Sequence, residues 1–434
     1  MLWPRTTSRA TTGELTIGGV SLADLARDYG TPLYVFDEMS LRERAQRVRN
    51  AFRRAHPRSR VVYAGKAYGA PAIIRIFREE GLGLDVASGG ELYAGLRAGM
   101  PAKLITFHGN NKSRTELAEA VAAGVGHVAL DNFHEIAMLQ EVAAAAGVRV
   151  AVLIRLNPGI DVHTHAKIAT GVLDSKFGFP VWEGSAQRAV AAVLASPNLE
   201  LDGYHAHIGS QLFDAEGYRL AIDALLDFAG EVKRTHGVAP RVFSPGGGFG
   251  IPYTEEMQEP DMQSWADLCA TAIVEGCERN DLPQPEVILE PGRSLVGPAG
   301  VALYTVGARK EIAGIRTYVS VDGGMADNIR PTLYDARYTA VLANRDGGRE
   351  RETVTIAGKF CESGDILIRD IALPPLQAGD LLAMPGAGAY CLAMASNYNL
   401  ATRPAVVIVR DGVTTLIRRR ETYADLLARD VLTD

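Results

Sequence analysis

The segment Val61-Val62-Tyr63-Ala64-Gly65-Lys66-Ala67 runs from apolar, β-favouring residues into a glycine and then a lysine. Its composition predicts a buried strand that ends next to the lysine. The same pattern recurs along the chain, where short apolar segments end in clusters of glycine and polar residues: Asp85–Glu91, His205–Gln211, Pro245–Gly250 and Glu290–Arg293. This recurrence decides the fold, because strands of a parallel barrel bring their carboxyl ends to one face.

The length and composition are those of a globular protein with more than one domain. The chain has 434 residues, 47% hydrophobic and 22% charged, with a net charge of −6. A single hydrophobic core rarely extends over this length, so two domains are expected. The negative net charge disfavours nucleic acid and anionic membrane surfaces as the main partners.

The cysteines and the start of the chain indicate a reduced, cytoplasmic protein. The four cysteines form no CxxC pair and show no metal-ligand spacing, so no metal site is expected. Residues 1–14 lack the apolar segment of a secretory signal. No apolar run reaches about 18 residues, so no transmembrane helix is expected.

Strand-like and helix-like segments alternate from about residue 41 to residue 290. Strands are predicted at 60–64, 84–87, 104–107, 127–130, 149–156, 201–208, 241–244 and 286–289. Helices are predicted at 71–80, 90–98, 113–123, 133–146, 183–195, 218–235 and 264–280. About eight strand–helix units predict an α/β fold, a (β/α)8 barrel over residues 38–290. A doubly wound open sheet is the alternative, but it needs neither eight units nor chemistry at every strand end.

After about residue 295 the pattern changes to short alternating segments separated by turn signals. Strands are predicted at 301–306, 316–321, 353–357, 380–384, 405–410 and 414–418. The N-terminal segments 15–20 and 33–36 also read as strands and are expected to join them. Residues 1–37 and 291–434 are therefore predicted to form a second, mostly β, barrel-like domain from both chain ends.

Nearly every predicted barrel strand ends in a residue suited to chemistry. These residues are Lys66, Asp85, Ser88, His108, Asn111, Asp131, Arg155, Asn157, His207, Ser210, Gly246–Gly248, Glu290 and Arg293. In (β/α)8 barrels the carboxyl ends of the strands carry the catalytic residues, and the opposite ends serve stability. Any one of these residues alone is more often structural, but their convergence indicates an active site.

Lys66 and the glycine cluster indicate a phosphorylated cofactor that is held as a Schiff base. Gly246–Gly248 can bind a phosphate through backbone N–H groups, although a tight turn is the simpler reading of three glycines. Ser210 can donate a further hydrogen bond. His207 is either a core histidine or a ring that covers a flat cofactor.

Glu290 has a carboxylate that is suited to a position beside such a cofactor. A carboxylate that faces a pyridine nitrogen keeps it protonated, so that the ring accepts electrons from a carbanion. A structural salt bridge with Arg293 is the alternative. Cys361 lies in the loop Cys361–Asp365, which is either an ordinary polar turn or the source of a thiol that protonates the carbanion.

The motifs, taken in order, resemble those of the fold-type III pyridoxal-phosphate decarboxylases, and within that family the diaminopimelate decarboxylases. The resemblance covers nearly the whole chain and is carried by Ala64–Ala67, Asp85–Glu91, His108–Ser113, His205–Gln211, Gly246–Ile251, Glu290–Arg293, Cys361–Asp365 and Ser396–Asn399. It implies a barrel that binds pyridoxal 5′-phosphate on Lys66 and a β domain that contributes substrate and dimer contacts.

The resemblance also implies which residues form the site. The catalytic residues would be Lys66, Cys361, His207 and Glu290. The cofactor would be bound by Lys66, Asp85, His207, Ser210, Gly246, Gly247, Gly248, Glu290, Pro291, Gly292, Arg293 and Tyr390. The substrate would be bound by Arg293, Arg330, Tyr334, Glu362 and Tyr390, with the arginines and Tyr334 on its distal carboxylate and Glu362 on its distal amine.

The reaction implied is the decarboxylation of meso-2,6-diaminopimelate to L-lysine and CO₂, the last step of lysine biosynthesis. Cys361 would return a proton to the carbon that lost CO₂. In this family Cys361 and Glu362 come from the partner subunit, so the resemblance implies a homodimer with shared active sites. The stretch 161–178 is long enough to form a lid over the site.

Three other functions fit the sequence less well. A decarboxylase for ornithine or arginine has no second carboxylate to hold, which fits poorly with Arg293 and Arg330. An alanine-type racemase shares the layout and the cofactor, but it needs a base on each side of Cα. A pyridoxal-phosphate carrier without catalysis resembles the barrel alone and leaves the second domain unexplained.

Overall fold

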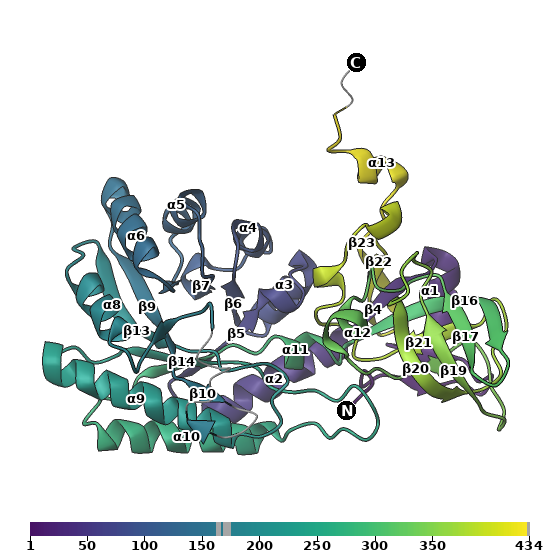
Figure 1. Ribbon diagram of the computed structural model, residues 1–434, viewed down its shortest axis with the longest axis horizontal. Helices are drawn as coiled ribbons and strands as arrows, with labels where there is room; N and C mark the ends of the chain where they lie inside the picture. Colours follow the sequence, from purple (N-terminus) through teal and green to yellow (C-terminus); the bar gives the residue numbers. More distant parts are fainter. Residues whose placement is uncertain (162–165, 168–174, 432–434) are drawn as a thin grey trace. The chain divides into compact units, whose positions relative to one another are not determined.

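The computed structural model describes residues 1–161, 166–167 and 175–431 (Figure 1). The chain divides into two compact units. The barrel unit comprises Arg44–Gly250 and Pro260–Gly292, and the β unit comprises Met1–Glu43, Ile251–Glu259 and Arg293–Asp434. The segment 251–259, which lies within the predicted barrel range, thus goes with the β unit. Most of the predicted lid at 161–178 lies outside the described residues.

Eight parallel strands form a closed barrel, which confirms the predicted fold. They are β5 (Ser59–Ala64), β6 (Gly83–Val86), β7 (Ile105–Phe107), β8 (His127–Leu130), β9 (Val150–Asn157), β13 (Leu199–His205), β14 (Val242–Gly246) and β15 (Glu286–Leu289). Their order is β9-β13-β14-β15-β5-β6-β7-β8, and the pairing of β8 with β9 closes the ring. Strands buried on both faces explain why the sequence shows apolar runs rather than alternation.

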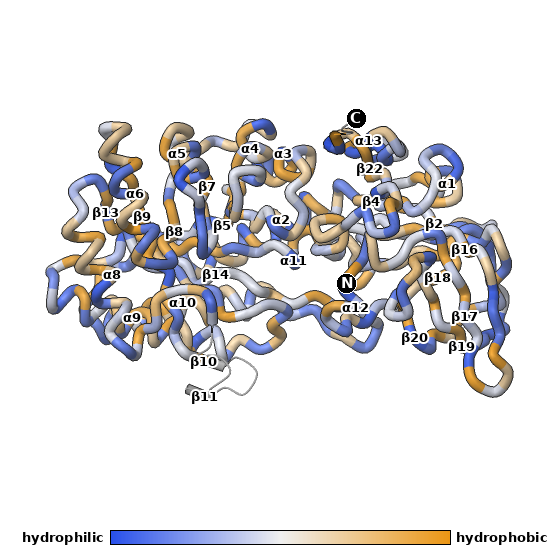
Figure 2. Tube along the Cα trace, turned by 45° about the horizontal axis from the view of Figure 1, so that its top comes forward, coloured by the Kyte–Doolittle hydropathy of each residue, from blue (hydrophilic) through white to orange (hydrophobic). Residues whose placement is uncertain are grey.

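Helices alternate with these strands along the chain and lie outside them (Figure 1). They are α2 (Glu38–Ala55), α3 (Pro71–Glu79), α4 (Gly89–Arg97), α5 (Arg114–Ala123), α6 (Phe133–Ala146), α8 (Ser185–Leu194), α9 (Glu216–His236) and α10 (Met262–Arg279). Along them hydrophobic and hydrophilic residues alternate at short intervals, as expected for helices with one buried face (Figure 2). Ser113 and Glu116 form the capping box that starts α5.

The β unit is built around one mixed sheet. Its strands run in the order β20 (Ile366–Leu373), β19 (Glu352–Ala357), β17 (Arg316–Val321), β16 (Gly300–Ile312), β4 (Leu33–Asp37), β22 (Ala405–Arg410) and β23 (Val413–Arg418). A further strand, β21 (Leu381–Met384), pairs with β16 and with the short β18 (Val341–Leu342). The N-terminal β4 pairs with β16 and with β22, so both chain ends build this sheet, as predicted.

Some details of the β unit differ from the prediction. The predicted strand at 15–20 does not join the main sheet: among the described strands, β2 (Leu15–Ile17) pairs only with β1 (Ser8–Arg9) and β3 (Val20–Ser21). The strand β20 was not predicted, because its Arg369-Asp370 pair interrupts the apolar pattern. Within the described ranges, no helix is both long and apolar enough to cross a membrane.

Candidate active site

Lys66 lies directly after β5, in the single 3-10 turn η1 (Gly65–Ala67), and its side chain is exposed. The turn is fixed by Tyr63, whose hydroxyl donates to the backbone oxygen of Tyr68 at 2.9 Å and accepts from its N–H at 3.1 Å. The Lys66 charge acts on Asp85, which lies buried in the neighbouring strand β6. The amine therefore stands at the strand-end face, with a carboxylate of the next strand within electrostatic reach.

The turn after β6 is held by its own side chains. Ser88 caps α4 by accepting from the N–H of Glu91, and Glu91 accepts from the N–H of Ala87 at 2.7 Å. Burial raises the pKa of Asp85, and the charge of Glu290 adds to the effect, while His108 and Lys66 oppose it. Asp85 is thus a carboxyl group that binds its proton at a higher pH than an exposed aspartate does.

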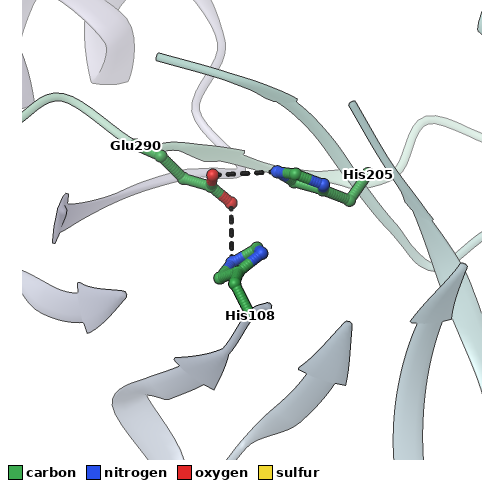
Figure 3. A group of neighbouring side chains, drawn as sticks. All are labelled: His108, His205 and Glu290. Atoms are coloured by element: carbon green, nitrogen blue, oxygen red, sulfur yellow. Dashed lines mark hydrogen bonds and ion pairs between the residues drawn. The ribbon is translucent and has the colours of Figure 1, made fainter. Parts of the chain in front are cut away.

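The Glu290 carboxylate lies between the side chains of His205 and His108 (Figure 3). One of its oxygens lies 2.9 Å from Nε2 of His205, and the other accepts from the Ser244 hydroxyl at 2.8 Å and lies 3.4 Å from Nε2 of His108. Burial disfavours a charged carboxylate here, but His205 and His108 outweigh burial and hold the pKa of Glu290 well below its usual value. Glu290 is therefore an ionised group in a buried position.

His205 and Ser244 contact Glu290 as well, although no role of their own is predicted for them from the sequence. Both can be found from the period of a strand, since residues two apart point to the same face. His205 precedes His207 by two positions, and Ser244 precedes Gly246 by two positions. Burial lowers the pKa of His205 to about 4, so its ring is neutral and donates from Nε2 to Glu290.

The glycine loop Gly246–Gly248 packs against the neighbouring strand ends. Gly246 and Gly248 have φ values of 83° and 101°, which favour glycine, and a Cβ on Gly247 would lie 2.0 Å from the backbone oxygen of Glu290. Among the described residues, none accepts a hydrogen bond from the N–H of Gly248 or of the buried Gly292. Two backbone donors therefore remain available for an anion.

His207 extends from the end of β13 and is half-buried. Its Nδ1 accepts from the N–H of Gly247 at 3.4 Å, which leaves the proton on Nε2. Burial, with the Lys66 charge, lowers the pKa of His207 well below its usual value, so the ring is neutral. Ser210 follows in the same turn, with an exposed side chain.

The other charged side chains near the strand ends have partners within the barrel unit. Arg155, at the end of β9, lies 3.6 Å from the Asp131 carboxylate, and its guanidinium stacks 4.3 Å from the ring of Phe177. Lys112 is buried and is held by Glu135 and by the backbone oxygen of Ala129, at 2.7 Å for the latter. These lysine and arginine side chains have internal partners and fix the loops around the site.

The β unit gathers a second group of predicted residues. Arg293 and Arg330 meet around the ring of Tyr253: the Cζ of Arg330 lies 4.6 Å from the ring centroid, and Nη1 of Arg293 donates to the Tyr253 hydroxyl at 2.5 Å. The half-buried Tyr390 lies under Arg293, at 4.6 Å from its Cζ. The Tyr338 hydroxyl accepts from Nη1 of Arg330. Three tyrosines thus surround two guanidinium groups.

Arg330 is a buried cation, with 5% of its surface exposed. No carboxylate of the described residues forms an ion pair with it; its partners are the two tyrosines and, near them, Cys391. An uncompensated buried charge is costly, and cation–π contacts offset only part of that cost. The position is therefore suited to an anionic ligand.

The other predicted substrate residues do not join this group. Tyr334 is on the same short helix as Arg330, α12 (Arg330–Tyr334), but 60% of its surface is exposed. Cys361 and Glu362 are also exposed. Thr332 of α12 donates to the backbone oxygen of Gly364 at 2.9 Å, which places the loop of Cys361 and Glu362 beside this helix.

The residues fit pyridoxal phosphate as donors and acceptors. The open N–H groups of Gly248 and Gly292 suit a phosphate, the ionised Glu290 suits a protonated pyridine nitrogen, and Lys66 offers an amine. The only described trio of side chains with metal-ligand spacing is His108, His205 and Glu290. Within that trio, His205 Nε2 is hydrogen-bonded to Glu290, whereas His108 Nε2 and His205 Nδ1 have no hydrogen-bond partner among the described residues.

Comparison with known proteins agrees with this chemistry. The pyridoxal-binding domain of the pyridoxal-dependent decarboxylases matches residues 38–297. The chain is 49% identical to the diaminopimelate decarboxylase of Bacillus subtilis over 419 residues, which cover 96% of this chain and 95% of the relative. It is 44% identical to the diaminopimelate decarboxylase of Mycobacterium leprae, with 99% of this chain and 92% of the relative covered.

A solved structure is similar over the full length. The diaminopimelate decarboxylase of M. jannaschii in complex with L-lysine superposes with a TM-score of 0.93 at 36% identity, covering 100% of this chain and 99% of that chain. The similarity therefore includes the β unit as well as the barrel.

Proposed function

This chain belongs to the pyridoxal-dependent decarboxylases, and we propose how its residues divide the work of the reaction. The protein is a carboxy-lyase that converts meso-2,6-diaminopimelate to L-lysine and CO₂, the last step of lysine biosynthesis, with pyridoxal 5′-phosphate as its cofactor. When bound, this cofactor supplies the electron sink that stabilises the carbanion left by the departing CO₂.

Barrel residues hold the cofactor. The amine of Lys66 attaches it, and the N–H groups of Gly248 and Gly292 bind its phosphate. Further contacts to the phosphate and ring come from Asp85, His207, Ser210, Gly246, Gly247 and Pro291. Glu290 keeps the ring nitrogen protonated, and the support for this role is its low pKa in a buried position. Arg293 and Tyr390 are assigned as further cofactor contacts.

Residues of the β unit bind the substrate. The observation that carries this assignment is the buried Arg330, which has no carboxylate partner among the described residues. Together with Arg293, Tyr334 and Tyr390 it binds the distal carboxylate of diaminopimelate, a group that ornithine and arginine lack. Glu362 binds the distal amine as an ion pair.

Cys361 returns the proton. Its thiol donates H⁺ to the carbon that lost CO₂, a new C–H bond forms, and the thiolate takes a proton from water. Cys361 and Glu362 act in the site of a second copy of the chain, so the protein works as a homodimer. Their exposure on the β unit, beside α12, supports this role. The four free thiols are typical of a cytoplasmic protein.

The function is tested by measuring CO₂ release from meso-diaminopimelate, ornithine and arginine in parallel, with the protein loaded with pyridoxal phosphate. We expect release from diaminopimelate alone, with one L-lysine formed for each CO₂. Release from ornithine or arginine only would keep the reaction but overturn the substrate role of Arg330. No release from any of the three would contradict the function.

A further inference from the structure

One tyrosine ring connects the two arginines of the β unit. The face of Tyr253 carries the Arg330 guanidinium at 4.6 Å, while its hydroxyl accepts from Arg293 at 2.5 Å. Only 4% of the Tyr253 surface is exposed, so both contacts are shielded from water. Burial raises the pKa of Tyr253, although the two arginines oppose the shift, so the hydroxyl keeps its proton.

A second tyrosine fixes the first. The ring of Tyr338 meets the ring of Tyr253 edge to face, with centroids 5.0 Å apart and an angle of 74°. The Tyr338 hydroxyl accepts from Arg330 and lies 3.6 Å from the Cys391 sulfur. Tyr253 therefore cannot rotate without breaking contacts with both arginines and with Tyr338.

The path of the chain points to the same residue. Residues 251–259 go with the β unit, although the chain belongs to the barrel unit immediately before and after them. Tyr253 is the residue of this excursion that contacts Arg293 and Arg330. The excursion thus supplies the ring that contacts both arginines, whereas Tyr390 and Tyr338 of the long segment 293–434 contact Arg293 and Arg330, respectively.

Two cations that share one ring repel each other, and each has a long, flexible side chain. Fixing both before a ligand arrives removes most of the ordering cost from the binding step. We propose that Tyr253 is a positioning residue: it holds Arg293 and Arg330 ready for one carboxylate, and thereby sets the preference for ligands that carry it. This inference rests on the proposed function, in which that carboxylate is the distal one of the substrate.

The test compares two ligands that differ only in the carboxylate. L-lysine keeps the distal carboxylate after the reaction, and cadaverine is the same diamine without it. Their dissociation constants are measured by calorimetric titration of the full-length, cofactor-loaded protein. Wild type, Tyr253→Phe and Tyr253→Leu are compared, with Tyr304→Phe as a matched control. Tyr304 is a buried tyrosine of the same unit whose hydroxyl donates to Asp327 at 2.6 Å.

We expect Tyr253→Phe, which keeps the ring, to raise the dissociation constant for L-lysine roughly fivefold. Tyr253→Leu should raise it roughly thirtyfold or more. The dissociation constant for cadaverine should change less than about twofold in each variant, and Tyr304→Phe should bind both ligands like the wild type. In turnover, Tyr253→Phe should raise KM for diaminopimelate and leave kcat near that of the wild type.

Two results would overturn the inference alone: unchanged L-lysine affinity in both Tyr253 variants, or an equal loss for L-lysine and cadaverine. The second result would mean that Tyr253 only supports the fold. A wild-type protein that does not prefer L-lysine to cadaverine would instead contradict the carboxylate site in the proposed function. A thermal melt shows whether Tyr253→Leu folds. If it does not fold, the affinities of Tyr253→Phe for the two ligands test the inference.

Discussion

Nε2 of His205 lies 2.9 Å from a carboxylate oxygen of Glu290, inside the carboxyl end of the barrel. Because the ring of His205 is neutral, this contact is a hydrogen bond from an N–H and not an ion pair. The second carboxylate oxygen accepts from Ser244 at 2.8 Å. Glu290 is therefore oriented by two buried donors, and its charge is kept at the place where the cofactor ring is proposed to need it.

The buried His205 makes the protein less stable in acid. Its pKa is about 4 in the folded chain and 6.5 in the unfolded chain, so the unfolded state binds more protons between these values. The free energy of unfolding should therefore fall as the pH drops from about 6.5 to about 4, by up to about 3 kcal/mol from this group. The low pKa of Glu290 acts in the same direction at lower pH.

This pH dependence is measured by denaturant unfolding at several pH values. His205→Gln should reduce the decrease in the free energy of unfolding between pH 6.5 and 4. His236→Gln, at the exposed end of α9, is the control and should keep the wild-type slope. An unchanged slope in His205→Gln would mean that another group causes the acid sensitivity.

Arg330 should matter for the substrate more than for the fold. Arg330→Leu removes a buried cation without an acidic partner, so we expect the free energy of unfolding to change by less than about 1 kcal/mol. We expect kcat/KM for diaminopimelate to fall on the order of 100-fold, because the distal carboxylate would lose the partner proposed for it. Calorimetric or denaturant unfolding and initial rates check the two parts.

Arg345→Leu is the matched control for Arg330. Arg345 lies in the same unit and pairs with the buried Asp380 at 2.7 Å. Its loss should destabilise the fold and leave the KM for diaminopimelate unchanged. The opposite pattern, with Arg330→Leu unstable but normal in KM, would make Arg330 a structural residue.

Cys361→Ala should separate turnover from cofactor binding. If Cys361 is the proton donor, as proposed, its loss slows reprotonation, and general acids contribute factors of roughly 10² to 10⁴. We expect kcat to fall on the order of 100-fold, with the dissociation constant of pyridoxal phosphate within about twofold of the wild type. Cys269→Ala, which removes a buried thiol of α10, should leave kcat unchanged. Full turnover in Cys361→Ala would exclude the thiol as the donor.

Mixing two inactive variants tests the shared site. If Cys361 acts in the partner's site, a mixed dimer of Lys66→Ala and Cys361→Ala has one site with both residues intact. Such mixtures should regain up to about one quarter of the wild-type activity, since half of the subunits pair as mixed dimers with one good site each. Mixed dimers shown by mass spectrometry but without activity would argue for sites within single chains.

The barrel could be predicted from the sequence because its strands are buried on both faces and end in glycine or polar residues. For example, β5 was predicted at 60–64 and lies at Ser59–Ala64, and β15 at 286–289 agrees fully. The residue pattern did not predict a strand where charged residues interrupt an apolar segment. The charged pair Arg369-Asp370 hid β20, which has a register irregularity in its pairing with β19.

The contacts of the site were harder to predict than its members. Lys66 and Glu290 could be named, because a charged group at the end of an apolar strand is conspicuous. His205 and Ser244 sit within the strands, where polar residues resemble ordinary core positions. Tyr253 could not be found at all, since its role depends on residues 251–259 leaving the barrel unit for the β unit, a long-range feature that no local pattern encodes.

The most direct test of the account is the position of the cofactor. The protein is loaded with pyridoxal phosphate, reduced with borohydride and digested, and the modified peptide is identified by mass spectrometry. We predict a single modified residue, Lys66, and none in Lys66→Ala. Lys112 is the informative competitor, because it also follows a barrel strand but is buried and held by Glu135 and the oxygen of Ala129. Modification of Lys112, or of any lysine other than Lys66, would contradict the assignment of the site.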